Sequence, residues 1–396
     1  MIPLSEVVKY STTRIDSRSL PLQNFVTTDS ILQNKAGLTD AINLPPSDNA
    51  LHAYAPGNIL IGNIRPYLKK IWFADRYGGS SADVLVFEVN KSYDPKFVYY
   101  SMCRDDFFTH MMNGVKGTKM PRGDKNHILS FPIPDYEISK EQQIASILTA
   151  LDMKIDLNQR INNELELIAK TLYDYWFVQF DFPNEDGQPY KNSGGKMVWS
   201  DELKREIPFG WEVGTLLDIA DYANGLPCQK FRPIGTDFIR VIKIKEMHEG
   251  FSFESERVRP DLPVYAIVNN GDVLFSWSAS LEVQIWSGGK GALNQHIFKV
   301  TSDKYPKYFY FYQLKNYLHH FKMMAENRKT TMGHITQEHL HQSKIAIPPR
   351  ELTLKLEKTI LPIFEKSINT KIENQHLTNL RDWLLPMLMN GQVKVN

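Results

Sequence analysis

The stretch "GNILIGNIRPYLKKIW", residues 57–72, has a counterpart in "GDVLFSWSASLEVQIW", residues 271–286. The two stretches agree at their ends, where Gly57 aligns with Gly271 and Trp72 aligns with Trp286. Their middles, "NIRPYLKK" and "WSASLEVQ", have no identical residue at any aligned position. A segment that keeps its ends and changes its middle indicates two copies of one structural unit with different contents.

The repeat extends over the whole chain of 396 residues. "PLSEVVKY" at residue 3 matches "TLLDIADY" at residue 215, and "SFPIPDYE" at residue 130 matches "KIAIPPRE" at residue 344. The offset between matching segments stays between 211 and 214 residues, a drift that small insertions and deletions produce. Internal repeats decide the fold before any local pattern is considered. The chain is therefore predicted to be two copies of one unit.

Each copy contains strand-like runs followed by a long helical pattern. "NILI", "DVLVFEV", "DVLF" and "HIFKV" are short apolar runs bounded by Gly, Asn and Pro, as strands are. Asp94 and Pro95 together predict a capped helix N-terminus. We predict an α+β fold in which two pseudo-repeated mixed domains are joined by two long antiparallel coiled-coil helices. The expected segments are a first domain at 1–138, a helix at 139–179, a linker at 180–209 anchored by Trp199 and Trp211, a second domain at 210–349 and a helix at 350–391.

The clearest periodicity follows Pro134, where seam residues recur in alternating steps of 4 and 3, as in a coiled coil. A lone helix of this length cannot bury its seam, so a partner helix from the second copy is expected, with a kink at Pro362. Asn158 and Asn162 are either polar residues that the seam tolerates or residues that fix its register or bind another subunit. The predicted seam and subunit interface comprises Leu148, Leu151, Ile155, Asn158, Asn162, Leu165, Leu172, Trp176, Ile368, Ile372, Leu377, Leu380 and Leu384.

Composition narrows the classes of protein. Hydrophobic residues make up 42% and charged residues 23% of the chain, which is ordinary for a folded protein. No apolar run reaches the length of about 18 residues that a membrane span needs, and "MIPLSEVVKY" lacks a signal-peptide pattern, so a cytoplasmic location is expected. Two distant cysteines suggest neither a disulfide framework nor a zinc site, and we expect no metal. The net charge of +1 neither indicates nor excludes nucleic acid.

Common catalytic motifs are absent from the sequence. There is no phosphate-binding loop, HExxH helix or GxSxG elbow, and no Asn/Asp-Pro-Pro-aromatic signature of an amino-methyltransferase. A nuclease-like pattern of Pro134, Asp135, Asp152 and Lys154 is present. Asp152 and Lys154 are expected on the outer faces of the long helix, and the second copy does not keep the pattern. Solvated helix charges are therefore the favoured interpretation.

Three stretches carry a resemblance to a known family: "PIPDYEISKEQQIASILTALDMKIDLNQRINNELELIAKTLYDYWFVQFDFP", "VWSDELKREIPFGWEVGTLLDIA" and "LTNLRDWLLPMLMNGQV". In this order they resemble the central helix, the entry into the second domain and the C-terminal ending of DNA-specificity subunits of type I restriction-modification systems. The first copy departs from the family pattern by lacking a Pro-x-Gly-Trp entry, and the second by lacking the usual glutamine after Pro-Pro.

The resemblance implies a non-catalytic reader of DNA. Each globular part would be a target recognition domain for one half of a bipartite site, and the helices would set the spacing between the halves. Two modification subunits carrying S-adenosylmethionine would methylate adenine N6 after flipping the base. Two translocating nuclease subunits, which use ATP and Mg, would join them. No cofactor is expected in this chain itself.

Residues for DNA contact are expected in two segments of each copy. One is the middle of the opening stretches, which differs between the copies and whose side chains can pair with base edges. The other is a basic loop, "KGTKMPRGDK", with its counterpart "NRKTTMGHI", suited to phosphates. The candidates from the middles are Asn63, Arg65, Tyr67, Lys69, Lys70, Trp277, Ser278, Ser280, Glu282 and Gln284. The candidates from the loops are Lys116, Lys119, Arg122, Lys125, Arg328, Lys329, Thr330, Thr331 and His334.

Two other functions stay open at this point. The chain could be a stand-alone nuclease that uses Asp135 and Asp152, or a coiled-coil scaffold that binds only proteins. DNA cleavage or methylation by the purified chain alone would favour an enzyme, whereas salt-dependent binding to duplex DNA would distinguish the reader from the scaffold. The sequence determines neither the bases read nor the spacer length.

Overall fold

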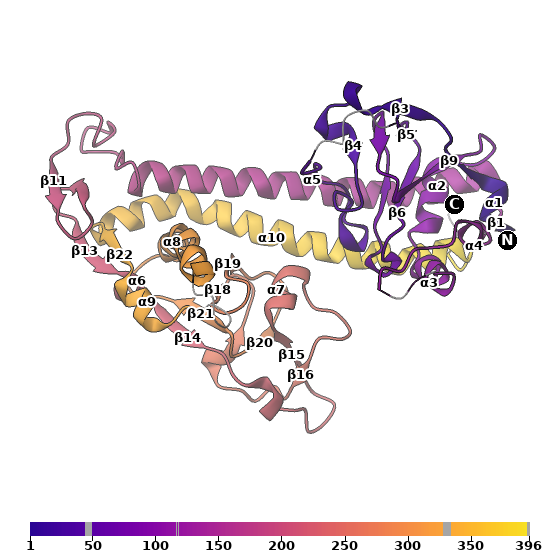
Figure 1. The fold of residues 1–396 in the computed structure, drawn as a ribbon. Coiled ribbons are helices and arrows are strands. Elements are labelled where there is room, and N and C mark those ends of the chain that lie inside the picture. The colour runs from indigo at the N-terminus through magenta and orange to yellow at the C-terminus, as the bar shows by residue number, and fades with distance from the viewer. Residues whose placement is uncertain (44–49, 116, 118, 328–333, 394–396) are drawn as a thin grey trace. The chain divides into compact units, whose positions relative to one another are not determined.

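The computed structural model describes residues 1–43, 50–115, 117, 119–327 and 334–393. The chain forms two compact units (Figure 1). Unit 1 comprises Met1–Ile155 and Leu377–Asn396, and unit 2 comprises Asp156–His376. The units therefore differ from the expected segments, because each long helix contributes one part to each unit. None of the described helices is both long and apolar enough to cross a membrane.

Unit 1 contains two four-stranded sheets, in the orders β2-β9-β6-β7 and β3-β5-β8-β4, and the small pair β1-β10. Its strands are β1 (Ile2–Pro3), β2 (Val8–Tyr10), β3 (Arg14–Asp16), β4 (Phe25–Val26), β5 (Ala50–Tyr54), β6 (Ile59–Gly62), β7 (Ile71–Phe73), β8 (Gly78–Ser80), β9 (Val84–Val89) and β10 (Pro132–Ile133). Its short helices are α1 (Leu4–Val7), α2 (Pro95–Met102), α3 (Asp105–Asn113) and α4 (Lys125–Leu129).

Unit 2 also contains two four-stranded sheets, in the orders β14-β21-β18-β19 and β16-β15-β20-β17, and the pair β13-β22. Its strands are β11 (Met197–Ser200), β12 (Arg205–Pro208), β13 (Glu212–Thr215), β14 (Asp221–Asn224), β15 (Ile239–Ile242), β16 (Arg257–Val258), β17 (Ile267–Val268), β18 (Val273–Ser276), β19 (Glu282–Ile285), β20 (Gly291–Leu293), β21 (Ile297–Thr301) and β22 (Lys344–Ile347). Its shorter helices are α6 (Leu216–Ile219), α7 (Ile244–Glu249), α8 (Lys307–Asn327) and α9 (Gln337–Gln342).

The first sheet follows the same path in both units, which confirms the predicted pseudo-repeat. In unit 1 an edge strand pairs with β9, which pairs with β6 and then β7, and in unit 2 the order is β14, β21, β18 and β19. Gly57 and Gly271 precede the third strand with φ of 89° and 90°, a left-handed conformation that glycine adopts at little cost. Asp94 caps α2 by accepting a 2.8 Å hydrogen bond from the Phe97 N–H, as its sequence predicts.

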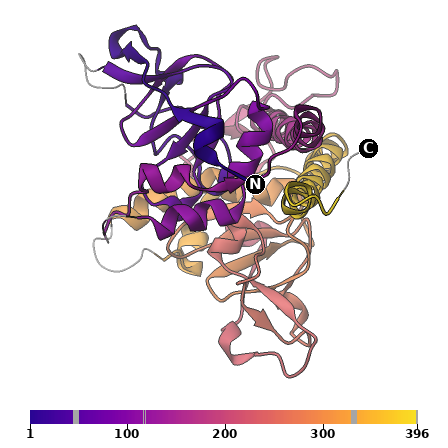
Figure 2. The ribbon, with the colours of Figure 1, turned by 90° about the vertical axis from the view of Figure 1, so that its right-hand side faces the viewer.

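The long helices are α5 (Ile138–Phe177) and α10 (Arg350–Met389), which lie side by side and antiparallel within each unit (Figures 1 and 2). In unit 1, Ile144 and Leu148 of α5 share a buried cluster with Leu385 and Leu388 of α10. In unit 2, Ala169 of α5 shares a cluster with Leu356, Ile360 and Phe364 of α10. The helical assignment of α10 continues through Pro362, whose side chain is exposed.

Three expectations about α5 and α10 are corrected by side-chain burial. Leu380 is 43% exposed and lies outside the seam, because Arg381 turns inward to pair with Asp152. Asp152 is accordingly at the contact between the helices of unit 1 and not on an outer face. At the C-terminal end of α5, Tyr173 and Phe177 are buried more deeply than the expected seam residues Leu172 and Trp176, since this end packs against α8 as well as α10.

Leu148 is fully buried, while Leu151, Ile155, Leu165, Ile368, Ile372, Leu377 and Leu384 are half-buried. Asn158 and Asn162 are both 1% exposed, so the seam of unit 2 contains a buried polar layer. Asn158 donates a 2.8 Å hydrogen bond to Glu373. This contact favours the interpretation in which Asn158 helps to fix the helix register, since an apolar residue there would leave Glu373 without that donor.

The segment expected to be a linker is partly an ordered hairpin. β11 and β12 pair from Met197 to Pro208, and Trp211 is buried against Phe180 and Phe182. Trp199 does not anchor the segment, because it is 61% exposed and its indole N–H bonds to Asp201 two residues away. An isolated hairpin is only marginally stable, so this one depends on its packing in unit 2.

Glu141 of α5 supports a prediction on pH. Its side chain is 0% exposed, and its Oε2 accepts a 2.8 Å hydrogen bond from the Asp94 N–H. Burial raises the pKa of Glu141 above its usual value. Because the folded pKa exceeds the unfolded one, the ionised form destabilises unit 1 at neutral pH, and this cost is relieved as pH falls through the folded value.

We expect Glu141→Gln to raise the free energy of unfolding by about 1 kcal/mol at pH 7. The gain should vanish below about pH 4, where glutamate is protonated in both states. Denaturant unfolding of the two proteins at neutral and acidic pH measures this difference. A gain of equal size at both pH values would contradict the assignment.

Candidate nucleic-acid interface

In unit 1, backbone hydrogen bonds join the β6–β7 connection to the basic loop. The Arg65 N–H donates to the Pro121 carbonyl at 2.8 Å, and the Gly123 N–H donates to the Asn63 carbonyl at 3.3 Å. The Asn63 N–H donates in turn to the Asp83 carbonyl at 2.9 Å. The two segments singled out in the sequence thus lie against each other.

Unit 2 uses two of the same backbone hydrogen bonds. The Ile335 N–H donates to the Trp277 carbonyl at 2.9 Å, and the Trp277 N–H donates to the His296 carbonyl at 3.3 Å. Trp277 therefore occupies the place of Asn63, and Ile335 occupies the place of Gly123. Both units join the same two segments in the same way, although the side chains there are unrelated.

The connections between the paired strands also contain unusual backbone. Arg65 and Lys69 have φ of 52° and 50°, and Ala279 in unit 2 has φ of 58°. A non-glycine residue in this left-handed region costs roughly 1–2 kcal/mol. Asn34 and Lys35 share this conformation, and the Lys35 N–H donates to the Lys69 carbonyl at 3.0 Å. Strain of this kind collects at functional sites more often than elsewhere.

A group of cations and carboxylates surrounds the unit 1 connection. The ammonium groups of Lys35 and Lys69 lie 3.3 and 2.9 Å from the Asp105 carboxylate. Arg122 pairs with Asp83 at 3.1 Å. Partial burial raises the pKa of Asp105, but Lys69 and Lys35 outweigh this effect and hold the pKa below its usual value. Asp105 is therefore ionised at neutral pH and holds both lysines in place.

The structure separates the unit 1 candidates into exposed and buried groups. Arg65, Tyr67, Lys119 and Arg122 are exposed, and Lys69 is half-buried. Asn63 and Lys70 are only 9% and 8% exposed, so of the unit 1 candidates they are the least accessible to DNA. Asn63 holds the loop through Gly123, and the Lys70 ammonium donates to the Thr28 carbonyl.

Lys125 and Lys116 complete the list of unit 1 candidates. Lys125 begins α4, and its ammonium lies 5.4 Å from the centre of the Tyr10 ring. The charges of Lys125 and Arg14 help to lower the pKa of His52, after burial, so Lys125 is grouped with these residues and not with Asp105. Lys116 lies outside the described residues.

The unit 2 candidates form a less charged surface. Trp277 is half-buried, and its ring lies 5.4 Å from that of the exposed His334. Glu282 lies 3.2 Å from His248, and Gln284 donates to the Met247 carbonyl at 2.9 Å. Ser278 is only 3% exposed, whereas Ser280 is exposed. The remaining candidates, Arg328, Lys329, Thr330 and Thr331, lie outside the described residues.

The two hairpins differ in register by two residues, which sequence alignment did not reveal. Leu60 pairs with Trp72 in unit 1, but Leu274 pairs with Gln284 and not with Trp286. Unit 1 places the 3-10 turn Pro66–Leu68 in its connection, and unit 2 closes the hairpin sooner, at Ser276 and Glu282. The matching tryptophans therefore do not occupy equivalent strand positions.

Lys35, Asp83 and Asp105 belong to the site but were not predicted. Lys35 precedes the first strand of the opening stretch by more than twenty residues, and Asp105 lies on α3. No local pattern marks them, because their role depends on a contact with Lys69 that only the fold creates. The one sequence feature that could have indicated Asp105 is that it lies close to the basic loop in the sequence.

Among the described residues, no group of three or more His, Cys, Asp or Glu side chains could hold a metal. Asp135 is exposed, and Asp152 accepts hydrogen bonds from Tyr100 at 2.7 Å and Arg381 at 2.9 Å. The Asp152 carboxylate is thus engaged in a structural contact between α5, α2 and α10 of unit 1.

Comparisons with known proteins agree with the repeat. The family model described as "Type I restriction modification DNA specificity domain" matches residues 4–167 and again residues 208–381. The chain is 26% identical to the type I restriction enzyme MjaIX specificity subunit of Methanocaldococcus jannaschii, over 76% of this chain and 69% of that protein. It is 25% identical to the HindI specificity subunit of Haemophilus influenzae, over 98% of each chain. The crystal structure of a type I S subunit from M. genitalium has a TM-score of 0.59 at 12% identity, covering 100% of this chain and 96% of that one, which shows a shared fold.

Proposed function

This chain belongs to the type I restriction-modification DNA specificity family, and from that premise we propose that each of its units reads one half of a bipartite DNA site. As a specificity subunit it recognises DNA and leaves catalysis to its partners. The surface assigned to reading is the hairpin connection and the basic loop of each unit. Base edges in the major groove would be contacted by the exposed side chains of these segments.

One observation carries this assignment. The carbonyl groups of Asn63 and Trp277 accept equivalent hydrogen bonds from the second segment, while the connections that follow them, "NIRPYLKK" and "WSASLEVQ", match at no aligned position. A common backbone with different side chains is what two readers of unlike half-sites require. In its described part the surface is basic in unit 1 and contains the aromatic rings of Trp277 and His334 in unit 2, so the two half-sites should differ in sequence.

A type I specificity subunit implies DNA, methyltransferase and restriction partners. In the proposed complex, two modification subunits bind S-adenosylmethionine and methylate adenine N6 after flipping the base. Two restriction subunits supply ATP- and Mg-dependent translocation and cleavage. The exposed outer faces of α5 and α10 are the surfaces proposed for these partners, and the complex is proposed to act in the cytoplasm.

Methylome sequencing of the host with and without this gene tests the proposal. Deletion should remove N6-methyladenine from one bipartite motif, and the intact gene supplied in trans should restore it. Persistence of every methylated motif after deletion would refute the function for a host whose modification subunit is expressed. Under the scaffold alternative, the purified chain should show no salt-dependent binding to duplex DNA.

A further inference from the structure

Arg65 stands at the position where the two units share a backbone conformation and differ most in side chain. Counting from the shared hydrogen bonds at Asn63 and Trp277, Arg65 corresponds to Ala279. Both are exposed and left-handed, with φ of 52° and 58°. We infer that Arg65 reads a guanine in the half-site bound by unit 1, an inference that rests on the proposed function.

The left-handed backbone conformation at Arg65 is determined by the loop and does not depend on the arginine side chain. Ala279 adopts the same conformation with a methyl side chain, so no interaction of a long side chain is needed to hold it. A left-handed non-glycine residue persists only where the surrounding structure fixes it. The position therefore projects any side chain from the same backbone, which allows one unit to carry an arginine and the other a methyl group.

The connection around Arg65 is rigid. The Arg65 N–H bonds to the Pro121 carbonyl, and the Arg65 carbonyl accepts a 2.9 Å hydrogen bond from the Leu68 N–H. Pro66 is buried beside it, and the Lys69 N–H bonds to the Pro66 carbonyl at 2.9 Å. A fixed backbone reduces the entropy lost when the guanidinium is ordered by a ligand, which favours specific over diffuse contact.

Charge pairing distinguishes Arg65 from Lys35, Lys69 and Arg122. Lys35 and Lys69 are paired with Asp105, and Arg122 is paired with Asp83, whereas Arg65 has no ion pair in the described part of the chain. Its guanidinium is free to present parallel N–H donors. Guanine offers O6 and N7 as two acceptors in the major groove, and arginine binds both at once. The paired cations remain suited to phosphates on either side.

The test uses the complete modification complex and duplexes in which single guanines are replaced by 7-deazaguanine, which lacks the N7 acceptor. With the wild-type complex, replacement of one guanine of one half-site should lower affinity several-fold, because N7 is lost while O6 still accepts. Arg65→Gly, which removes both hydrogen bonds, should weaken binding to the unmodified duplex roughly 5-fold to 150-fold, the range for one bidentate pair. At that guanine, the variant should lose no further affinity on replacement.

Arg65→Gly is chosen because glycine adopts the left-handed conformation without strain, so the variant should melt at the same or a higher temperature than wild type. Arg18→Ala, which removes an exposed arginine of unit 1 outside both segments, is the matched control and should keep the full response to 7-deazaguanine. Arg65→Lys retains the charge but not the paired donors and should behave like Arg65→Gly at the critical guanine.

Two results would overturn the inference. One is an equal loss from 7-deazaguanine in wild type and Arg65→Gly at every position. The other is uniform weakening at all sequences with a lower salt slope, which identifies a phosphate contact. If the wild-type complex shows no sequence preference at all, the proposed function fails first, and that outcome is seen before any variant is made.

Discussion

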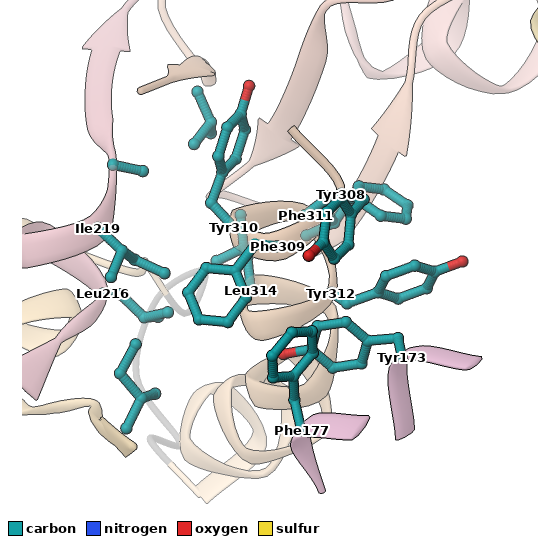
Figure 3. Close-up of a cluster of buried hydrophobic side chains, with 14 of the residues drawn as sticks. Tyr173, Phe177, Leu216, Ile219, Tyr308, Phe309, Tyr310, Phe311, Tyr312 and Leu314 are labelled. Atoms are coloured by element: carbon teal, nitrogen blue, oxygen red, sulfur yellow. The ribbon is translucent and has the colours of Figure 1, made fainter. Parts of the chain in front are cut away.

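Tyr173→Ala is expected to lower the free energy of unfolding of unit 2 by roughly 3–5 kcal/mol, the usual cost of deleting a buried aromatic ring. Tyr173 is 1% exposed and its ring lies between 4.9 and 6.4 Å from those of Phe177, Tyr308, Phe309 and Tyr312 (Figure 3). These rings come from α5 and α8, so the cavity would loosen the contact that holds the long helix to the second domain.

Tyr173→Phe provides the matched control. The Tyr173 hydroxyl is buried and has no hydrogen-bond partner among the described residues, and burial raises its pKa far above the usual value. Removing this oxygen keeps the ring and eliminates an unsatisfied polar atom, so the variant should be as stable as wild type or slightly more stable. Denaturant unfolding with near-ultraviolet circular dichroism measures both changes. Equal destabilisation by the two variants would mean that the hydroxyl, and not the ring, stabilises the cluster.

Tyr173 also shows where the heptad pattern ceased to predict burial. The alternating steps of 4 and 3 identified Leu148 as buried, as the structure shows, and continued to Leu172 and Trp176. A heptad describes packing against one partner helix. Once α8 packs on α5 as a second partner, the buried face widens to include Tyr173 and Phe177. No periodicity in α5 alone contains that information.

The repeat itself could be predicted from the sequence, because the matching segments form matching strands. Gly57 and Gly271 keep their positive φ, and the strand order of the first sheet coincides in the two units. The two-residue shift between the hairpins could not be predicted, since the two stretches have equal length and each ends in a tryptophan. The shift appears only in the strand pairing, where Trp72 faces Leu60 and Trp286 faces no residue of β18.

For the candidate interface, the sequence identified the two segments but not the direction of each side chain. Among residues of similar chemistry, Arg65 is exposed while Lys70 is buried with its ammonium on a carbonyl. The difference follows from the turn at Pro66–Leu68, which no spacing rule places. Exchanging the whole middles between units would therefore transfer buried residues along with exposed ones, and exposed positions such as Arg65 are the better test of specificity.

Arg381→Ala should lower the free energy of unfolding of unit 1 by about 2–3 kcal/mol, somewhat less than the loss of a partner from a fully buried ion pair. The Arg381 side chain is 18% exposed, and its Nη1 donates to Asp152 Oδ1 at 2.9 Å. Burial alone would lower the pKa of Arg381, but Asp382 and Asp152 raise it. Without the guanidinium, the half-buried Asp152 carboxylate would keep only the Tyr100 hydroxyl as a strong donor.

Leu380→Ala is the decisive comparison, because Leu380 and Arg381 are adjacent and only one of them can face α5. If Leu380 occupied the seam, its truncation would cost roughly 2–5 kcal/mol. At 43% exposure it should instead cost less than about 1 kcal/mol, as surface substitutions do. A double-mutant cycle between Arg381→Ala and Asp152→Ala should give a coupling energy of roughly 1–3 kcal/mol. Additive effects in the cycle would contradict the ion pair between Arg381 and Asp152 at the helix contact. A larger loss of stability from Leu380→Ala than from Arg381→Ala would show that Leu380, and not Arg381, packs in the seam.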